Sequence, residues 1–326
     1  MDAALTTLFS PVILFFVLGI LAAVARSDLA IPESLAKGMS LYLMAAIGLK
    51  GGVQVAAAGF STEILLALLA GAALSALLPI LAFPLLKTIG GIDALNAGAV
   101  AAHYGSVSVV TYVTGVEILT AANMIPDGYM VAVLALMETP AILVGIWLAR
   151  RGVKDKKAEN RGGNGLLHEV LFNGSVVLLV GSFLIGIVGG EAGFEPIAPL
   201  FEGIFKGVLC LFLLDMGLIA ARRLIDSRAL NARLVTLGIV LPIVNGTIGA
   251  AVAGLIGLSG GTAVAFVILA ASASYIAVPA AMRMAMPQAD AGLYLSLSLG
   301  VTFPFNITLG IPYYIFIVDL LIGSTP

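Results

Sequence analysis

The sequence predicts an all-α membrane protein with ten transmembrane helices, arranged as two inverted five-helix repeats. Composition gives the first indication: 60% of the 326 residues are hydrophobic and 10% are charged, with a mean hydropathy of +1.13, far from the balance of a soluble domain. Apolar stretches long enough to cross about 30 Å of hydrocarbon recur along the chain. None shows the alternation with period two that is typical of a membrane β-barrel.

The second indication is an internal duplication. Three separate blocks recur at nearly constant offset: 35–38 at 204–207 (offset 169), 99–110 at 266–278 (offset near 168) and 137–140 at 301–304 (offset 164). A constant offset over three blocks indicates duplication rather than shared composition. Five crossings per repeat force the second copy to cross in the opposite direction.

The apolar runs predict the spans in order. They cover residues 9–25, 35–58, 62–86, 92–120 and 127–150 in the first repeat, and 168–189, 199–221, 230–258, 260–283 and 290–322 in the second. The first repeat therefore occupies 1–150 and the second 168–326. Between them, residues 151–167 are rich in Gly, Asn and charge and resemble a flexible linker.

Basic residues set the expected orientation. Lys and Arg gather in the connection around 150–161 and in the one around 222–233, which should both be cytoplasmic. Both termini then lie outside, and the linker 151–167 lies inside a multi-pass protein of the plasma (inner) membrane. Of 16 basic residues, only Lys50 and Lys206 fit this poorly. Asp2, with no basic residue before it, argues against a cleaved signal peptide.

Several function classes find no support in the sequence. It has no Walker loop, no metal-ligand spacing and no nucleic-acid signature, which argues against ATP-driven pumping by this chain alone. A single cysteine, Cys210, excludes an intramolecular disulfide framework.

Two helix breaks at matching positions predict a substrate site. The apolar fourth span is interrupted at Gly105, Ser106, Val107 and Ser108, and the ninth at Ser272, Ala273, Ser274 and Tyr275. Glycine permits a break, and serine is a good cap for the helix that follows. Two half-helix N-termini facing each other would bind an anion without buried Lys or Arg. The alternative is that these serines only allow close helix packing.

A second matched pair of irregularities predicts the ion-coupling site. Glu138 precedes Pro140 in the fifth span, and Thr302 and Asn306 flank Pro304 in the tenth. Proline frees carbonyl oxygens that can serve a cation or proton. A carboxylate within a span is functional by default, so Glu138 is the main coupling candidate, with Thr111, Thr302 and Asn306 as possible further ligands. Thr302, Asn306 and Thr308 could equally be polar contacts between helices.

Five other polar residues within the spans have structural interpretations. Asp215 and Lys50 are predicted to form a structural ion pair. His103 is expected to be a neutral, hydrogen-bonded histidine, although it could titrate and support proton coupling. Tyr104 and Tyr275 flank the two breaks, where they either line the pocket or pack.

These residues bear a family resemblance. Its motifs are Ile31-Pro32-Glu33-Ser34, Ile47-Gly48-Leu49 with Gly51-Gly52, Gly105–Ser108, Glu138-Thr139-Pro140-Ala141, and Ala271–Ser274 leading to Pro279 and Arg283. In this order the chain, apart from the central linker, resembles the sodium-dependent bicarbonate transporters of cyanobacteria and their bacterial relatives.

The resemblance implies a five-plus-five inverted fold with core and gate domains, a homo-oligomer (often a trimer), and sodium-driven import of bicarbonate at the two breaks. Cyanobacterial members also bind a PII-like cytoplasmic regulator. They carry an Asp where this chain has Tyr275, which removes a carboxylate from the expected sodium site.

We therefore expect a secondary transporter that imports bicarbonate by alternating access, with sodium as the coupling ion, no other cofactor and no nucleic-acid partner. Alternatives are a proton-coupled or uncoupled transporter of another small anion such as a short carboxylate, and a cation–proton exchanger using Glu138 and Asp215. An intramembrane hydrolase built from His103, the serines and Asp215 is the least favoured, because His103 has no counterpart in the second repeat.

Overall fold

The computed structural model describes residues 10–59, 61–151, 174–226 and 230–323, and these form helices and connections without strands. Within these ranges six helices are long and apolar enough to cross a membrane, and Pro11–Val24 and Gly260–Ala271 are shorter apolar helices. The family comparison reported below and these helices confirm a helical membrane protein. The count of ten crossings stays a prediction.

In residues 10–59 and 61–151, the structure has six helices in the order expected. They are α2 (Pro11–Val24), α3 (Glu33–Ala58), α4 (Thr62–Thr88), α5 (Ala94–Gly105), α6 (Val109–Ala121) and α7 (Met130–Arg150). The predicted fourth span is thus two half-helices, α5 and α6. Beyond Arg151, the predicted linker lies outside the described residues.

The second half follows the same order with more irregular helices. Its elements are α9 (Gly174–Phe194), α10 (Phe205–Asp226), α11 (Ala232–Leu255), α12 (Gly260–Ala271), α13 (Ala277–Ala285), α14 (Ala291–Leu295), α15 (Phe303–Phe305) and α16 (Ile311–Ile322). A 3₁₀ turn η2 (Glu195–Ile197) and π-helical turns η3 (Pro199–Gly203), η4 (Ser296–Thr302) and η5 (Asn306–Gly310) connect some of them.

Two differences from the predicted spans stand out in this half. The seventh span begins at Phe205 rather than 199, because Pro199 opens the separate turn η3. The tenth is an alternation of α and π turns rather than one regular helix, and such π-bulges often occur at functional sites.

Helix starts are fixed by side-chain caps. Ser10, Ser61, Asp93, Asn231 and Asp290 each accept a hydrogen bond from the backbone N–H three residues ahead. Such a cap satisfies one of the four N–H groups that the first helical turn leaves unpaired.

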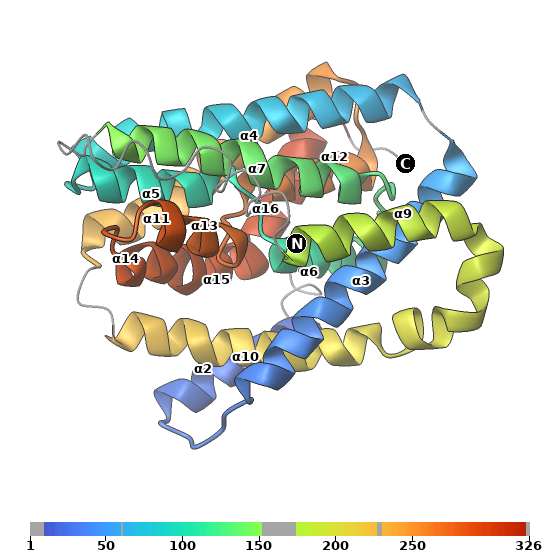
Figure 1. Ribbon diagram of the computed structural model, residues 1–326, viewed down its shortest axis with the longest axis horizontal. Helices are drawn as coiled ribbons and strands as arrows, with labels where there is room; N and C mark the ends of the chain where they lie inside the picture. The colour runs from blue at the N-terminus through green and yellow to red at the C-terminus, as the bar shows by residue number, and fades with distance from the viewer. Residues whose placement is uncertain (1–9, 60, 152–173, 227–229, 324–326) are drawn as a thin grey trace.

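The helices pack as two groups. The crossing group contains α4–α7 and α11–α16, with α4, α5 and α7 in mutual contact and α11, α12 and α16 likewise. The flanking group contains α2, α3, α9 and α10, where α3 packs on α9 and α2 on α10. In Figure 1, α4 and α7 lie along the top, while α10 and α2 lie along the bottom.

Glycine contacts bring the flanking helices together at close range. A Cβ on Gly217 of α10 would lie against the Phe16 carbonyl of α2, and one on Gly52 of α3 would lie against the Phe183 carbonyl of α9. Small residues at such contacts let membrane helices approach closely. Any larger side chain at either glycine would push the two helices apart.

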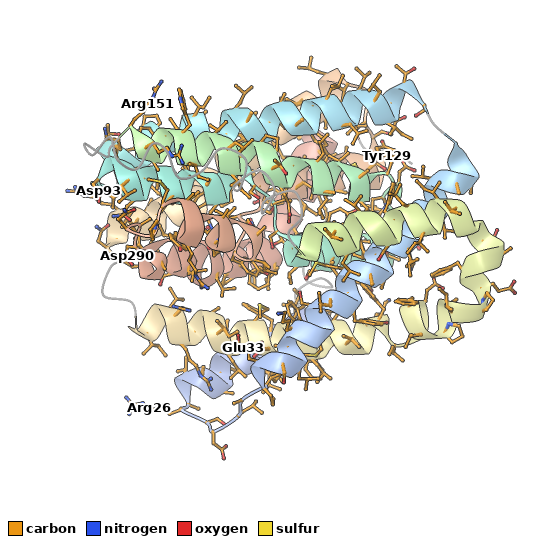
Figure 2. All side chains as sticks on the ribbon, viewed as in Figure 1. Arg26, Glu33, Asp93, Tyr129, Arg151 and Asp290 are labelled. Atoms are coloured by element: carbon orange, nitrogen blue, oxygen red, sulfur yellow. The ribbon has the colours of Figure 1, made fainter. Side chains whose placement is uncertain are left out.

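The polarity of α4 is that of a membrane helix. Leu65, Leu69 and Leu77 are more than half exposed, whereas Gly71 and Ser75 are buried. Apolar side chains outside and small or polar ones inside are expected where lipid, not water, surrounds the helix. Charged residues such as Arg26, Asp93, Arg151 and Asp290 lie instead at the edges of the molecule (Figure 2).

Candidate anion site at the crossing of two broken helices

Both predicted helix breaks are present. The first separates α5 from α6 at residues 106–108, and the second separates α12 from α13 at residues 272–276. Ser106, Ser108, Ser272 and Ser274 are all at most 3% exposed. The breaks therefore place polar backbone deep inside the crossing group.

The two breaks hydrogen-bond to each other. The Ser274 N–H donates to the His103 carbonyl at 2.9 Å, and the Ser108 N–H donates to Ser272 Oγ at 2.9 Å. The His103 ring donates from Nδ1 to the Ser274 carbonyl. Segments about 170 residues apart in sequence thus form one buried crossing.

These contacts show how the ring nitrogens of His103 are hydrogen-bonded. A carbonyl only accepts, so Nδ1 carries the proton, and the buried Nε2 has no partner among the described residues. The ring also stacks on Tyr294, with centroids 4.7 Å apart. The expectation of a hydrogen-bonded histidine is confirmed. Because Nδ1 donates in both the neutral and the charged ring, the neutral form stays a prediction.

The C-terminal ends of the two half-helices at the crossing are capped by asparagine amides. Asn245 Nδ2 of α11 donates to the Tyr104 carbonyl at 3.0 Å, and Asn306 Nδ2 donates to the Ala271 carbonyl at 3.1 Å. Both asparagines are fully buried. Carbonyls that would otherwise present negative charge to the crossing are therefore partly neutralised.

The N-terminal ends of the following half-helices keep free donors. Ser108 Oγ caps only the Thr111 N–H, at 3.2 Å, and Ile276 gives α13 no side-chain cap. The first-turn N–H groups of α6 and α13, such as those of Val109 and Ala277, have no intrahelical acceptor by geometry. The crossing thus offers donors and two positive dipole ends to an anion.

The predicted coupling residues fall into two classes. Thr111 Oγ1 and Glu138 Oε2 are buried and have no partner among the described residues. In contrast, Thr302 Oγ1 donates to the Gly238 carbonyl at 2.7 Å and lies 2.7 Å from the Tyr104 hydroxyl. The Asn306 Oδ1 atom accepts from the Tyr314 hydroxyl at 2.6 Å.

Ion binding by these four residues stays a prediction, but the geometry separates them. Glu138 and Thr111 have oxygen atoms free for a cation, whereas Thr302 and Asn306 would have to exchange protein partners for it. Glu138 lies next to the first break, because Ser106 Oγ donates to the Glu138 backbone carbonyl at 3.4 Å.

The helix around Pro140 is interrupted by a side chain. Ser75 Oγ of α4 accepts from the Ala141 N–H at 3.1 Å and donates to the Met137 carbonyl. The hydroxyl therefore stands in for a helical hydrogen bond beside the proline and places Glu138 inside an irregular turn. Pro140 indicated this irregular turn in the sequence, but no sequence pattern indicated that Ser75 of α4 would bond to it.

The predicted ion pair between Asp215 and Lys50 is wrong. Lys50 Nζ lies 3.1 Å from Glu202 Oε1 in η3, and Asp215 Oδ2 is buried without a partner among the described residues. The repeat alignment placed both residues near mid-span but could not show which helix face each occupies.

Tyr275 lies at the second break with its ring against Phe303, which it meets edge-on at 5.3 Å. Its buried hydroxyl faces Ser108 of the first break without a hydrogen bond of normal geometry among the described residues. The sequence prediction missed Asn245 altogether, since a lone asparagine in an apolar helix gives no signal beyond ordinary polar contact between helices.

Comparison with known proteins identifies the family. The profile of the Na⁺-dependent bicarbonate transporter superfamily matches residues 11–319, nearly the whole chain and both helix breaks. A search of curated proteins found no match. Membership in a transporter family indicates transport rather than catalysis. This chain, with its buried crossing of two broken helices, belongs to the Na⁺-dependent bicarbonate transporter superfamily.

Proposed function

We propose that this protein imports bicarbonate together with sodium, by alternating access between two inverted five-helix repeats. The observation that carries the proposal is the polarity of the crossing: its carbonyl ends are capped by Asn245 and Asn306, whereas its N–H ends are free. A site of this kind favours an anion.

The charge of the site fits a monovalent anion. Each half-helix N-terminus carries the equivalent of roughly half a positive charge, so α6 and α13 together balance about one negative charge. Among the lining residues of the two breaks, 105–108 and 272–275, there is no Lys or Arg. A multivalent anion would therefore be held less well than bicarbonate.

Sodium coupling rests on the free oxygens of the first repeat. Glu138 is 4% exposed and Thr111 is 1% exposed. A buried carboxylate without a partner is costly unless a cation or proton joins it. A sodium ion at Glu138, beside the anion at Ser106, would lower the cost of burying both charges and so link their movements.

The contacts within the flanking group support inversion. The α3–α9 contact uses Gly48 and Gly186, and the α2–α10 contact uses Gly19 and Gly217. Gly217 lies 169 positions after Gly48, and Gly186 lies 167 positions after Gly19. The same repeat positions therefore meet twice, as expected when each repeat supplies one helix to each contact.

Ion pairs support the proposed orientation with both termini outside. Lys50 and Lys206 are the two basic residues that this orientation places poorly. Lys50 pairs with Glu202 at 3.1 Å, and Lys206 pairs with Glu117 at 3.2 Å. Because each charge is balanced locally, the two exceptions weigh little against the positive-inside rule.

The decisive experiment measures uptake of labelled bicarbonate into proteoliposomes, with an inward sodium gradient and with sodium replaced by a large organic cation. We expect uptake only with sodium. Uptake that does not depend on sodium would support the anion site but contradict sodium coupling. Proton coupling or facilitated flux would then be the hypotheses to test, with variants of His103 and Glu138. No uptake by folded protein would overturn bicarbonate as the substrate and favour small carboxylates.

A further inference from the structure

One ion pair joins the two helix groups. Lys206, in the first turn of α10, places its Nζ 3.2 Å from Glu117 Oε2, near the end of α6. The helix α10 packs on α2 and α3 in the flanking group and also contacts η4 of the crossing group, whereas α6 packs on α12 within the crossing group. The pair therefore bridges elements that must separate if the two groups move relative to each other.

The Lys206–Glu117 pair differs from a fully exposed ion pair because its carboxylate is mostly buried. The Glu117 side chain is 13% exposed and that of Lys206 is 65% exposed. A mostly buried carboxylate gains more from a cation than an exposed one does, because less water screens the attraction.

The second ion pair provides an internal comparison. Lys50 of α3 meets Glu202 of η3, and both side chains are about half exposed. Lys50 belongs to α3, and the turn η3 that carries Glu202 leads into α10. Both residues are therefore on the side of the flanking group, and this pair does not join the two groups. It has similar geometry without the bridging position.

The repeats do not share the bridging pair. Lys206 corresponds to Lys37 at the offset of 169, but positions 281–285, which correspond to Glu117, contain no acidic residue and include Arg283. An inverted repeat places the corresponding location at the opposite end of the interface between the groups. Among the described residues, an ion pair therefore crosses this interface at one end.

We propose that the Lys206–Glu117 pair is a latch that holds one end of the interface closed and biases the resting transporter toward opening at the other end. This rests on the proposed alternating access. In the proposed orientation the latched end faces outward, so the resting protein is inward-open. Lys206 and Glu117 are positioning residues: they touch neither substrate nor coupling ion.

The chain carries its own reporter of this latch. Cys210 is the single cysteine, is partly buried, and lies one helical turn after Lys206 on the same face of α10. It is close enough to Glu117 to experience its charge. Separation of α10 from α6 would expose the thiol to a membrane-impermeant maleimide.

The test measures the rate at which external maleimide labels Cys210 in sealed right-side-out vesicles. Lys206→Glu and Glu117→Gln both break the latch but shift the local charge in opposite directions. An exposed or partly exposed ion pair changes an equilibrium by about two- to fivefold, so we expect both variants to label about two- to fivefold faster. A direct effect of charge on the thiol would instead move the two rates in opposite directions.

The charge-swapped protein, Lys206→Glu with Glu117→Lys, should return to within about twofold of the wild-type rate. Lys50→Glu and Glu202→Lys are the matched controls and should leave the rate unchanged. Unchanged labelling in both latch variants, or no recovery in the swap, would overturn the latch. Labelling from inside-out vesicles only would overturn its outward placement. None of these readouts requires bicarbonate, so failure of the latch is separable from failure of the transport proposal.

Discussion

The two breaks at the crossing differ although they lie at matching positions of the repeat that the sequence predicts. The first spans residues 106–108 and ends in a capping serine, Ser108, while the second spans 272–276 and starts α13 without a side-chain cap. The first repeat supplies free oxygens at Thr111 and Glu138. The second supplies both asparagine caps. The two breaks therefore share a geometry but differ in the polar groups that surround them, and we expect them to differ in their chemical tasks.

The sharpest test of this division compares Glu138 with its repeat counterpart Thr302. Glu138→Gln should reduce sodium-driven uptake by about 10- to 100-fold, because the ion loses a charged ligand, an interaction of ~1.5–3 kcal/mol. Thr302→Val should leave the sodium dependence intact but lower the thermal stability by about 1–3 kcal/mol, because the Gly238 carbonyl loses its donor. Uptake assays and thermal unfolding in detergent distinguish the two. Equal sodium dependence in Glu138→Gln and wild type would contradict the division.

The next comparison concerns the serines on either side of the crossing. Ser106→Ala and Ser274→Ala should each raise the KM for bicarbonate about tenfold, since a hydrogen bond to a charged group contributes ~1.5–3 kcal/mol. Ser298→Ala is a suitable control, because that hydroxyl only bonds back to the Tyr294 carbonyl of its own helix. Loss from only one serine would instead suggest a single nucleophile and favour the hydrolase alternative.

The two asparagine caps provide a third test, on stability. Asparagine to aspartate keeps the shape but removes the donor, so Asn245→Asp and Asn306→Asp should each lower the unfolding free energy by about 1–3 kcal/mol. Asn231→Asp is the matched control, since Asn231 caps α11 by accepting from the Leu234 N–H, which a carboxylate can also do. A stable Asn306→Asp variant with altered sodium affinity would contradict the structural role and support the prediction that Asn306 binds the ion.

These comparisons show what the sequence could and could not predict. Gly105 and the serines marked both breaks because local backbone chemistry determines where a helix can open. Glu138 stood out because a carboxylate in an apolar run is costly. Asn245, Ser75 and the partner of Lys50 could not be predicted, since each depends on which face of a distant helix lies opposite. Repeat symmetry gives correspondence in depth, and it does not give rotation about the helix axis.

Tyr275→Phe is the smallest expected change and examines the second break directly. The hydroxyl is buried and faces Ser108 without a hydrogen bond of normal geometry among the described residues, while the ring packs on Phe303. The substitution removes a buried hydroxyl that lacks a good hydrogen bond and leaves the packing of the ring unchanged. It should therefore raise the unfolding free energy by up to about 1 kcal/mol in the absence of substrate. If the hydroxyl turns to the bound anion, the same change should raise the KM for bicarbonate about threefold. Thermal unfolding with and without bicarbonate separates these effects: a stabilised apoprotein that gains less from bicarbonate than wild type would assign Tyr275 to the anion pocket, and an equal gain would assign it to packing alone.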